Sequence, residues 1–224
     1  MPQVVELGWI PVKHDYEHSS AGEAIEALEP KLMQNHDVLG YWKGIKGHGA
    51  LDATPIKGCD LATVWTSVEA ARAAKQTAEF QQAAKLWGQI IETDSHYGPV
   101  QPWVDYFLLD GDEFETVIRS KVVLLSGFYL NVDADIEAFS KTWEELNFSL
   151  SVSPGYIAGT HGWSVGNLDH KGGLKKVFMA VTGWENAETM KTAIANDKAQ
   201  VDERLKALNV QQHEHVSHGL SKIK

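Results

Sequence analysis

The sequence predicts an α+β protein made of two tandem β-α-β-β-α-β units. Two observations support this fold class: a short segment of the chain is repeated, and each half shows the same order of strand and helix patterns. Among the 224 residues, 43% are hydrophobic and 22% are charged, as in ordinary globular proteins. We therefore expect two ferredoxin-like halves, at residues 1–112 and 113–224.

The repeat is clearest around a glycine-rich segment. Residues 40–47 (Gly-Tyr-Trp-Lys-Gly-Ile-Lys-Gly) return as residues 155–162 (Gly-Tyr-Ile-Ala-Gly-Thr-His-Gly), with four of the eight positions identical. A second block matches downstream, where Thr66, Glu69, Ala71 and Lys75 correspond to Thr182, Glu185, Ala187 and Lys191. Two matching blocks in the same order indicate a diverged duplication.

In the first half, β-branched and aromatic residues indicate strands, and alanine and leucine at helical spacing indicate helices. Ser19 or Ser20, followed by Glu23, is typical of a helix start. Pro30 is expected to kink or end that helix. The expected elements are a strand at 4–13, a helix to about 35, an extended segment at 40–51, a strand at 59–66, a helix at 68–89 and a strand at 100–109.

The second half repeats this order. Asp133 is the expected cap of a helix that carries Ile136, Phe139, Trp143 and Leu146 at helical spacing. Each half yields an antiparallel sheet, and two such sheets can bury their open faces against each other. The other expected elements are strands at 117–131, 155–165 and 174–182, a helix at 186–208 and a strand at 211–223, with the linker near 110–113.

Composition excludes several classes of protein. There are 20 basic and 30 acidic residues, so a net charge of −10 argues against binding to nucleic acid or anionic lipid. No apolar run is long enough to span a bilayer, and the N-terminus lacks the pattern of a secretory signal, so we expect a soluble cytoplasmic protein. The single cysteine, Cys59, excludes an intrachain disulfide.

With this element order and the segment Trp-Thr-Ser-Val-Glu-Ala at residues 65–70, the chain resembles the dimeric α/β-barrel superfamily. That group includes antibiotic-biosynthesis monooxygenases, aromatic polyketide cyclases, EthD-like proteins and stress-responsive A/B-barrel proteins. The resemblance implies that the two halves close one barrel within a single chain, with a ligand cleft between a sheet and its helices and, in many members, no cofactor. The His-Pro-x-His motif of the stress and cyclase branch is absent: residues 78–81 are Ala-Glu-Phe-Gln, so that branch's catalytic residues do not transfer.

The second strand of each half supplies the first candidate site residues. Side chains two apart share a face, and the repeat therefore groups Trp42, Lys46 and His48 with Ile157, His161 and Trp163. Histidine carries protons near neutral pH, and flat aromatic walls suit a planar substrate. We expect His48 to be the catalytic base and His161 a second candidate, with Trp42 and Tyr41 binding the substrate. The alternative is that these are sheet residues with satisfied hydrogen bonds.

A second aromatic cluster lies on the strand expected at 100–109. Alternation places Trp103, Asp105 and Phe107 on one face and Tyr106 on the other. The Tyr106 hydroxyl could hold or protonate a phenolate or enolate oxygen. Trp103 and Phe107 are candidate substrate contacts, as is Trp65 on a neighbouring strand. A core role for Tyr106 and Trp65 is the alternative.

Residues 87–99 have no counterpart of equal length in the second half. An insertion that carries Glu, Asp, His and Tyr is where a cover for a cleft would be built. His96, near Asp94, could serve as an oriented base, although a solvated polar loop would look the same. The asymmetry favours the first half as the one that holds the cleft.

Metal and cofactor signals are weak. His213, His215 and His218 resemble a metal-binding cluster, but strand alternation turns His218 away from the other two. Motifs for phosphate loops, dinucleotides and nucleophile elbows are missing from the sequence. Some relatives with the fold that this chain resembles bind haem, but no axial haem ligand can be assigned in this sequence. We therefore expect neither a metal nor another cofactor.

These observations lead to a hypothesis and its alternatives. The chain is expected to be a cofactor-independent enzyme that acts on a small aromatic or polyketide-like molecule by general acid–base chemistry, as a monooxygenase, cyclase, isomerase or lyase. The alternatives are a non-catalytic barrel that binds hydrophobic ligands or responds to stress, and a barrel that binds metal or haem. Both a monomer and a homodimer remain open.

Overall fold

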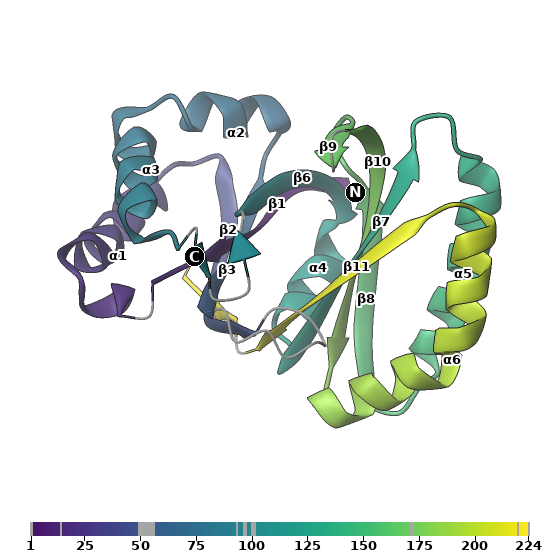
Figure 1. Ribbon diagram of the computed structural model, residues 1–224. Coiled ribbons are helices and arrows are strands. Elements are labelled where there is room, and N and C mark those ends of the chain that lie inside the picture. Colours follow the sequence, from purple (N-terminus) through teal and green to yellow (C-terminus); the bar gives the residue numbers. More distant parts are fainter. Residues whose placement is uncertain are drawn as a thin grey trace.

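The computed structural model describes the chain except for residues 1, 14, 49–56, 93, 96–97, 100–101, 171–172, 219 and 224. A barrel of antiparallel strands occupies the middle of the molecule, and helices lie on opposite outer sides of it (Figure 1). No helix among the described residues is long and apolar enough to cross a membrane.

The N-terminal half places its long strands and helices close to the predicted ranges. Ser19 caps α1 by accepting a hydrogen bond from the Gly22 N–H at 3.0 Å, and α1 runs through Pro30 to its end at Leu32. The elements are β1 (Pro2–Pro11), a 3-10 helix (Tyr16–His18), α1 (Ser20–Leu32), β2 (Val38–His48), β3 (Lys57–Trp65), α2 (Val68–Ala74), α3 (Ala78–Ile90), β4 (Asp94–Ser95), β5 (Gly98–Pro99) and β6 (Trp103–Asp110).

The C-terminal half follows the same order. The cap of its first long helix is Asp135, which accepts a hydrogen bond from the Ala138 N–H at 2.9 Å, and not Asp133 as predicted. The elements are α4 (Gly111–Ile118), β7 (Val122–Asn131), α5 (Ile136–Ser151), β8 (Tyr156–Trp163), β9 (Leu168–His170), β10 (Gly173–Trp184), α6 (Ala187–Ala207), β11 (Gln211–His218) and β12 (Ser221–Lys222).

The strands form a ring. Each half contributes its four long strands in the same order, β6-β1-β3-β2 and β11-β7-β10-β8. One seam joins β2 to β11, where His48 pairs with Val216. At the other, Phe107 of β6 bridges to Ser164, which follows β8, and the Val165 N–H donates to the Tyr106 carbonyl at 2.8 Å. The predicted fold class, two ferredoxin-like units that close one barrel in a single chain, is confirmed.

The region between the halves differs from the prediction. The expected linker and the first part of the strand predicted at 117–131 form helix α4 instead. One face of this helix is apolar, because Val117 and Ile118 follow Phe114 by three and four residues. All three side chains are fully buried in the core between the sheets. This apolar spacing favours a helix over an alternating strand. The division at residue 112 therefore falls inside α4, and it stays a proposal.

The repeat matches the wrong residues at one junction. Trp65 ends β3 and Ser67 caps α2, whereas Trp184 ends β10 and Asn186 caps α6. The structure therefore aligns Trp65 with Trp184, although the second repeat block paired Thr66 with Thr182. The helix predicted at 68–89 is also broken, because α2 ends at Ala74 and Lys75 forms its C-cap.

Each sheet has one face toward the other sheet and one face toward its own helices. The core between the sheets contains Val5, Leu7, Val64, Leu125 and Met179, contributed by both halves. The outer face of the N-terminal strands lies toward α1 and α3, and that of the C-terminal strands lies toward α5 and α6 (Figure 1). These two spaces between sheet and helices are very different.

Candidate functional site

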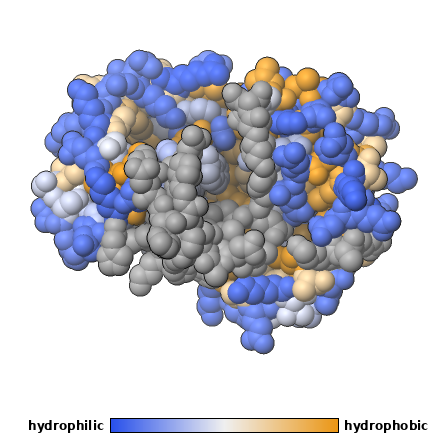
Figure 2. All heavy atoms as spheres, in the orientation of Figure 1, coloured by the Kyte–Doolittle hydropathy of each residue, from blue (hydrophilic) through white to orange (hydrophobic). Residues whose placement is uncertain are grey.

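A cleft of about 460 Å³ lies between the N-terminal strands and helices α1 and α3. We call it the N-terminal cleft. Its volume falls in the range of small-molecule sites, about 300–1,000 Å³. Most of its lining is apolar and includes the side chains of Ile25, Leu32, Leu61, Trp65, Phe80 and Trp87. On the surface, hydrophobic residues show as patches between hydrophilic ones (Figure 2).

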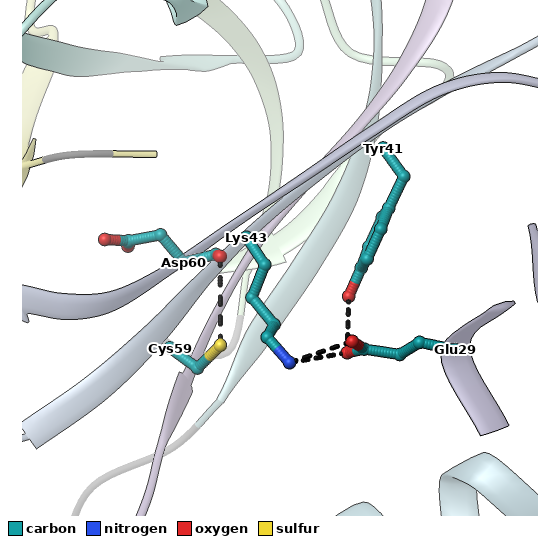
Figure 3. A network of polar contacts seen from close by, with 5 residues as sticks. All are labelled: Glu29, Tyr41, Lys43, Cys59 and Asp60. Carbon is teal, nitrogen blue, oxygen red and sulfur yellow. Dashed lines mark hydrogen bonds and ion pairs between the residues drawn. The ribbon is translucent and has the colours of Figure 1, made fainter. Parts of the chain in front are cut away.

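A buried ion pair forms one end of the cleft. The Lys43 ammonium donates to both carboxylate oxygens of Glu29, at 2.8 and 2.9 Å, and the Tyr41 hydroxyl donates to Oε1 of Glu29 at 3.3 Å (Figure 3). Glu29 and Lys43 are only 7% and 8% exposed. Two charges can be kept at such depth because each is paired and hydrogen-bonded. Tyr41 and Glu29 line the cleft, and Lys43 holds the carboxylate in place.

A second ion pair lies farther along the floor. The Lys75 ammonium donates to Oε1 of Glu6 at 2.5 Å, and the Trp65 indole N–H donates to Oε2 of Glu6 at 2.9 Å. The ammonium also lies 4.7 Å from the centre of the Tyr106 ring. Lys75 reaches this position because α2 ends immediately before it. Its side chain is 39% exposed, whereas that of Glu6 is 12% exposed, so Lys75 is the more accessible partner.

The Tyr41 hydroxyl and the Lys75 ammonium keep their protons at neutral pH. Burial, together with the negative charge of Glu29, raises the pKa of the Tyr41 hydroxyl well above its ordinary value. Burial of Lys75 works to lower the pKa of its ammonium, but the attraction of Glu6 outweighs it, and the pKa is raised. The cleft therefore presents a neutral hydroxyl and a cation beside two carboxylates.

Three residues predicted from the sequence belong to this region. Tyr41 and Trp65 line the cleft, and Tyr106 lies on the same sheet face, beside Lys75. Burial is the main cause that raises the pKa of Tyr106. Trp65 is also a core residue, since its side chain is 1% exposed and packs in an apolar cluster.

Three other predicted substrate contacts lie on the opposite face of the same sheet. Trp42, Trp103 and Phe107 pack in or against the core between the sheets, where the Trp42 ring meets Phe114 edge-on at 5.8 Å. The prediction that Trp42 shares a face with His161 is wrong. Irregular pairing in both β2 and β8 breaks the simple alternation on which it depended.

The predicted histidines do not gather at the cleft among the described residues. His161 is on the helix-facing side of the C-terminal sheet, with its ring 5.6 Å from that of Trp143 and 5.3 Å from that of Phe178. Burial against these rings lowers the pKa of His161. His96 and the side chain of His48 lie outside what the structure describes, as do the side chains of the three histidines of β11. Within the described part of the chain, no group of acidic, histidine and cysteine residues could hold a metal ion.

The corresponding space in the C-terminal half is filled by aromatic rings. Their centroids lie 5.1–6.2 Å apart, in the tilted and edge-on arrangements that aromatic pairs prefer. A hollow of about 350 Å³ borders only the edge of this cluster, beside Trp163 and Lys176. The rings belong to Phe128, Phe139, Trp143, Trp163 and Phe178. We call this set the C-terminal aromatic core.

The charged residues of the cleft were missed by sequence reasoning, although the sequence holds a signal for them. Glu6 interrupts an apolar strand, and Glu29 lies on the apolar face of α1, four residues after Ile25 and one after Leu28. A charge at a buried position needs a partner, which Lys43 and Lys75 supply. Which lysine meets which glutamate depends on contacts across elements, and the sequence alone does not show them.

No protein-family model and no curated protein sequence matches the chain. Solved structures do match its fold. A protein from Lactobacillus acidophilus named "putative monooxygenase" matches with a TM-score of 0.52 and 12% identity, over 100% of this chain and 100% of its own. An anthrone oxidase-like protein matches with a TM-score of 0.60 and 10% identity, over 98% of this chain and 93% of its own. A haem-binding protein from Thermus thermophilus matches with a TM-score of 0.54 and 8% identity, over 97% of this chain and 91% of its own. These similarities define the class: the chain has a fold of the dimeric α/β-barrel type.

Because a haem-binding protein shares this fold, we compared the cleft with the needs of haem. Haem iron takes histidine, cysteine, methionine or tyrosine as an axial ligand. Among its described lining residues the cleft has no histidine or cysteine, so Met33 lacks the histidine that accompanies methionine as a haem ligand, and Tyr41 is bound to Glu29. Lys43, which could otherwise meet a propionate group, is buried and paired with Glu29. The described residues do not fit haem, and we derive no step through it.

Proposed function

We propose that the chain is an enzyme that binds a small, flat, mainly apolar molecule in the N-terminal cleft and moves a proton on it. One observation carries this proposal: a buried array of Tyr41, Glu29 and Lys43 opens into an apolar cleft with aromatic walls. Acid–base groups that meet beside an apolar cavity are typical of active sites that act on carbon acids or phenols.

The array supports a proton relay. The Tyr41 hydroxyl takes a proton from the substrate as it passes its own proton to the Glu29 carboxylate, to which it is already hydrogen-bonded. Lys43 donates to both carboxylate oxygens and keeps the carboxylate oriented. The negative charge left on the substrate spreads through its flat conjugated system to a second oxygen, where the Lys75 ammonium stabilises it. The immediate product is an enolate or a phenolate.

An enolate formed in this way has three outcomes that need no cofactor. It takes a proton at another carbon (isomerisation), attacks a carbonyl group of the same molecule (cyclisation), or reacts with dioxygen. In the last case a methylene group and O₂ give a carbonyl group and water, so the methylene carbon is oxidised by four electrons and dioxygen is reduced by four. The names of two structures with this fold, a monooxygenase and an anthrone oxidase-like protein, favour the oxygenase. We keep His48 and His96 as candidates for a second proton carrier.

A binding protein without catalysis is the second candidate. Its support is that Glu6 and Glu29 already accept two or more hydrogen bonds each, as in a purely structural arrangement. Such a protein would hold the same ligand in the same cleft, with no change in the ligand.

The test compares two tyrosines. Tyr41→Phe removes the relay hydroxyl and keeps the ring, and Tyr156→Phe is the matched control, because Tyr156 packs on Trp184 away from the cleft. We chose these in preference to Glu29→Gln, since a lysine left unpaired at this depth costs about 3–5 kcal/mol of stability. Oxygen uptake and absorbance change are measured with anthrone and hydroxynaphthalenones.

Tyr41→Phe is expected to lower kcat by about 10²–10⁴-fold with little change in the KM for anthrone, which has no hydroxyl group, and Tyr156→Phe to leave both unchanged. Full turnover by Tyr41→Phe would contradict the relay. Ligands that bind to the wild-type protein and are recovered unchanged would instead support the binding protein.

A further inference from the structure

Four polar side chains cross the floor of the N-terminal cleft in one row. Tyr106 pairs with Glu6, Glu6 with Thr63, and Thr63 with Tyr41. Directly paired residues of neighbouring strands share a face, so the row runs across β6, β1, β3 and β2 on the side of the helices. Neighbouring strands lie about 4.8 Å apart, which puts the backbones of Glu6 and Tyr41 about 10 Å from each other.

The charges lie on either side of Thr63, which is uncharged. Near β1, Glu6 holds Lys75, and near β2, Tyr41 meets Glu29 and Lys43. Thr63 supplies only a hydroxyl between them. The next row of the floor, Val104, Gly8 and Leu61, is apolar until it reaches Lys43. A molecule that lies along this floor therefore meets polar groups at both ends and carbon along most of its length.

The two ends differ in what they offer a ligand. An ammonium has three N–H donors; Glu6 engages one of those of Lys75, and the centre of the Tyr106 ring lies 4.7 Å from its nitrogen. A remaining donor suits a carbonyl or anionic oxygen. At the other end, the Tyr41 hydroxyl gives its hydrogen to Glu29 and keeps lone pairs that accept from a ligand hydroxyl.

We propose that the N-terminal cleft selects a flat, mainly apolar molecule with a hydroxyl group at one end and a carbonyl or anionic oxygen about 10 Å away, at the other. The anionic or carbonyl oxygen binds Lys75, and the hydroxyl binds Tyr41. This inference rests on the proposed function and names the substrate class of the same cleft. Phe80 and Trp87 line the cleft and supply aromatic surface for the apolar middle of the ligand.

The first experiment changes only the ligand. Isothermal calorimetry on the wild-type protein compares 4′-hydroxybiphenyl-4-carboxylate, whose polar ends are separated by two rings, with three probes that each lack one feature. Biphenyl-4-carboxylate lacks the hydroxyl, 4-hydroxybiphenyl lacks the anion, and 4-hydroxybenzoate is one ring shorter. The complete probe is expected to bind about 3- to 10-fold more tightly than the probe without the hydroxyl, and about 10-fold or more tightly than the other two.

The second experiment assigns each end of the ligand to a residue. In Lys75→Met, probes with and without the carboxylate should bind with equal affinity, while the hydroxyl should still increase affinity. In Tyr41→Phe, the hydroxyl should no longer increase affinity, while the carboxylate should still do so. Lys85→Met is the control, since Lys85 lies exposed on α3 outside the cleft lining. Equal affinity of the wild type for the complete and truncated probes, or no binding of any of them, would overturn the substrate class.

The outcome is separable from that of the proposed function, because calorimetry detects binding and the tyrosine test detects turnover. A two-ended preference without turnover of any substrate would support the ligand class and reject the enzyme. Turnover of substrates with a single oxygen function, together with no two-ended preference, would reject the ligand class alone.

Discussion

The N-terminal cleft and the C-terminal aromatic core occupy equivalent places on sheets with the same strand order. In the C-terminal sheet, Phe128 pairs with Phe178, and Phe178 with Trp163, so an aromatic row crosses β7, β10 and β8. On the helix-facing side of the N-terminal sheet, a polar row runs from Tyr106 to Tyr41; it crosses β3 at Thr63, two residues before Trp65, whereas the aromatic row crosses β10 at Phe178, six residues before Trp184. The difference teaches that one architecture yields a cleft or a core according to the side chains on its helix-facing rows.

The physical reason is how the side chains pack. Aromatic rings from the sheet and from α5 interlock and exclude water, so their space is filled. Ion-paired side chains satisfy one another at the floor of the N-terminal sheet, and among the described residues no side chain of comparable bulk fills the volume above them. We infer that the C-terminal half stabilises the barrel and that the N-terminal half carries the function.

The largest expected effect tests the aromatic core. Phe139→Ala removes a ring that is 1% exposed and contacts Phe128 and Phe178, so it should lower the free energy of unfolding by about 3–5 kcal/mol. Phe80→Ala removes a ring that already borders empty space, and its cost should stay below about 2 kcal/mol. Urea unfolding of both variants measures the difference. Equal losses would break the comparison between core and cleft.

A medium effect comes from adding atoms instead of removing them. Ala180→Leu places three more carbon atoms among packed rings and should cost about 1–3 kcal/mol. Ala83→Leu places the same atoms against the cleft, where there is room, so its effect on stability should stay within about 1 kcal/mol. It should also weaken binding of 4′-hydroxybiphenyl-4-carboxylate by about 10-fold or more. Unchanged affinity in Ala83→Leu would show that the ligand binds elsewhere.

The smallest expected effect is a pH dependence from His161. Burial against the aromatic rings lowers the folded-state pKa of His161 below its unfolded value of about 6.5, so protonation favours the unfolded chain. The stability that depends on the neutral ring is fully present above about pH 6.5 and declines as the pH falls through the lowered folded-state pKa. Because His161 is partly exposed, we expect its pH-dependent contribution to the free energy of unfolding to be less than about 0.5 kcal/mol.

Thermal unfolding of the wild type and of His161→Phe at pH 8 and pH 5 checks this sign. The wild type should lose slightly more stability than the variant on going to pH 5. A larger loss in the variant would mean that protonated His161 stabilises the fold, contrary to the direction given by its burial.

Sequence reasoning predicted the fold better than the site. The order of elements and the tandem halves agree with the structure, because both depend on periodicity and repetition that are visible along the chain. A cleft lies in the half that the sequence favoured, and that this half holds the functional site stays a prediction. Tyr41 and Trp65 line the cleft, and their role in binding a substrate stays a prediction. Trp42 lies on the opposite face of the sheet, since counting residues across an irregular strand reverses the assigned face.

The sequence by itself determined which segments become strands and helices, and that two like units follow each other, because hydrophobic periodicity and helix caps act over a few residues. Only the tertiary structure decided that Glu29 meets Lys43 and Tyr41, and that Glu6 meets Lys75, which follows it by 69 positions. Those pairings depend on the strand register and on where α2 ends, and both are set by packing between elements. The same packing fills one sheet–helix space with rings and leaves the other open.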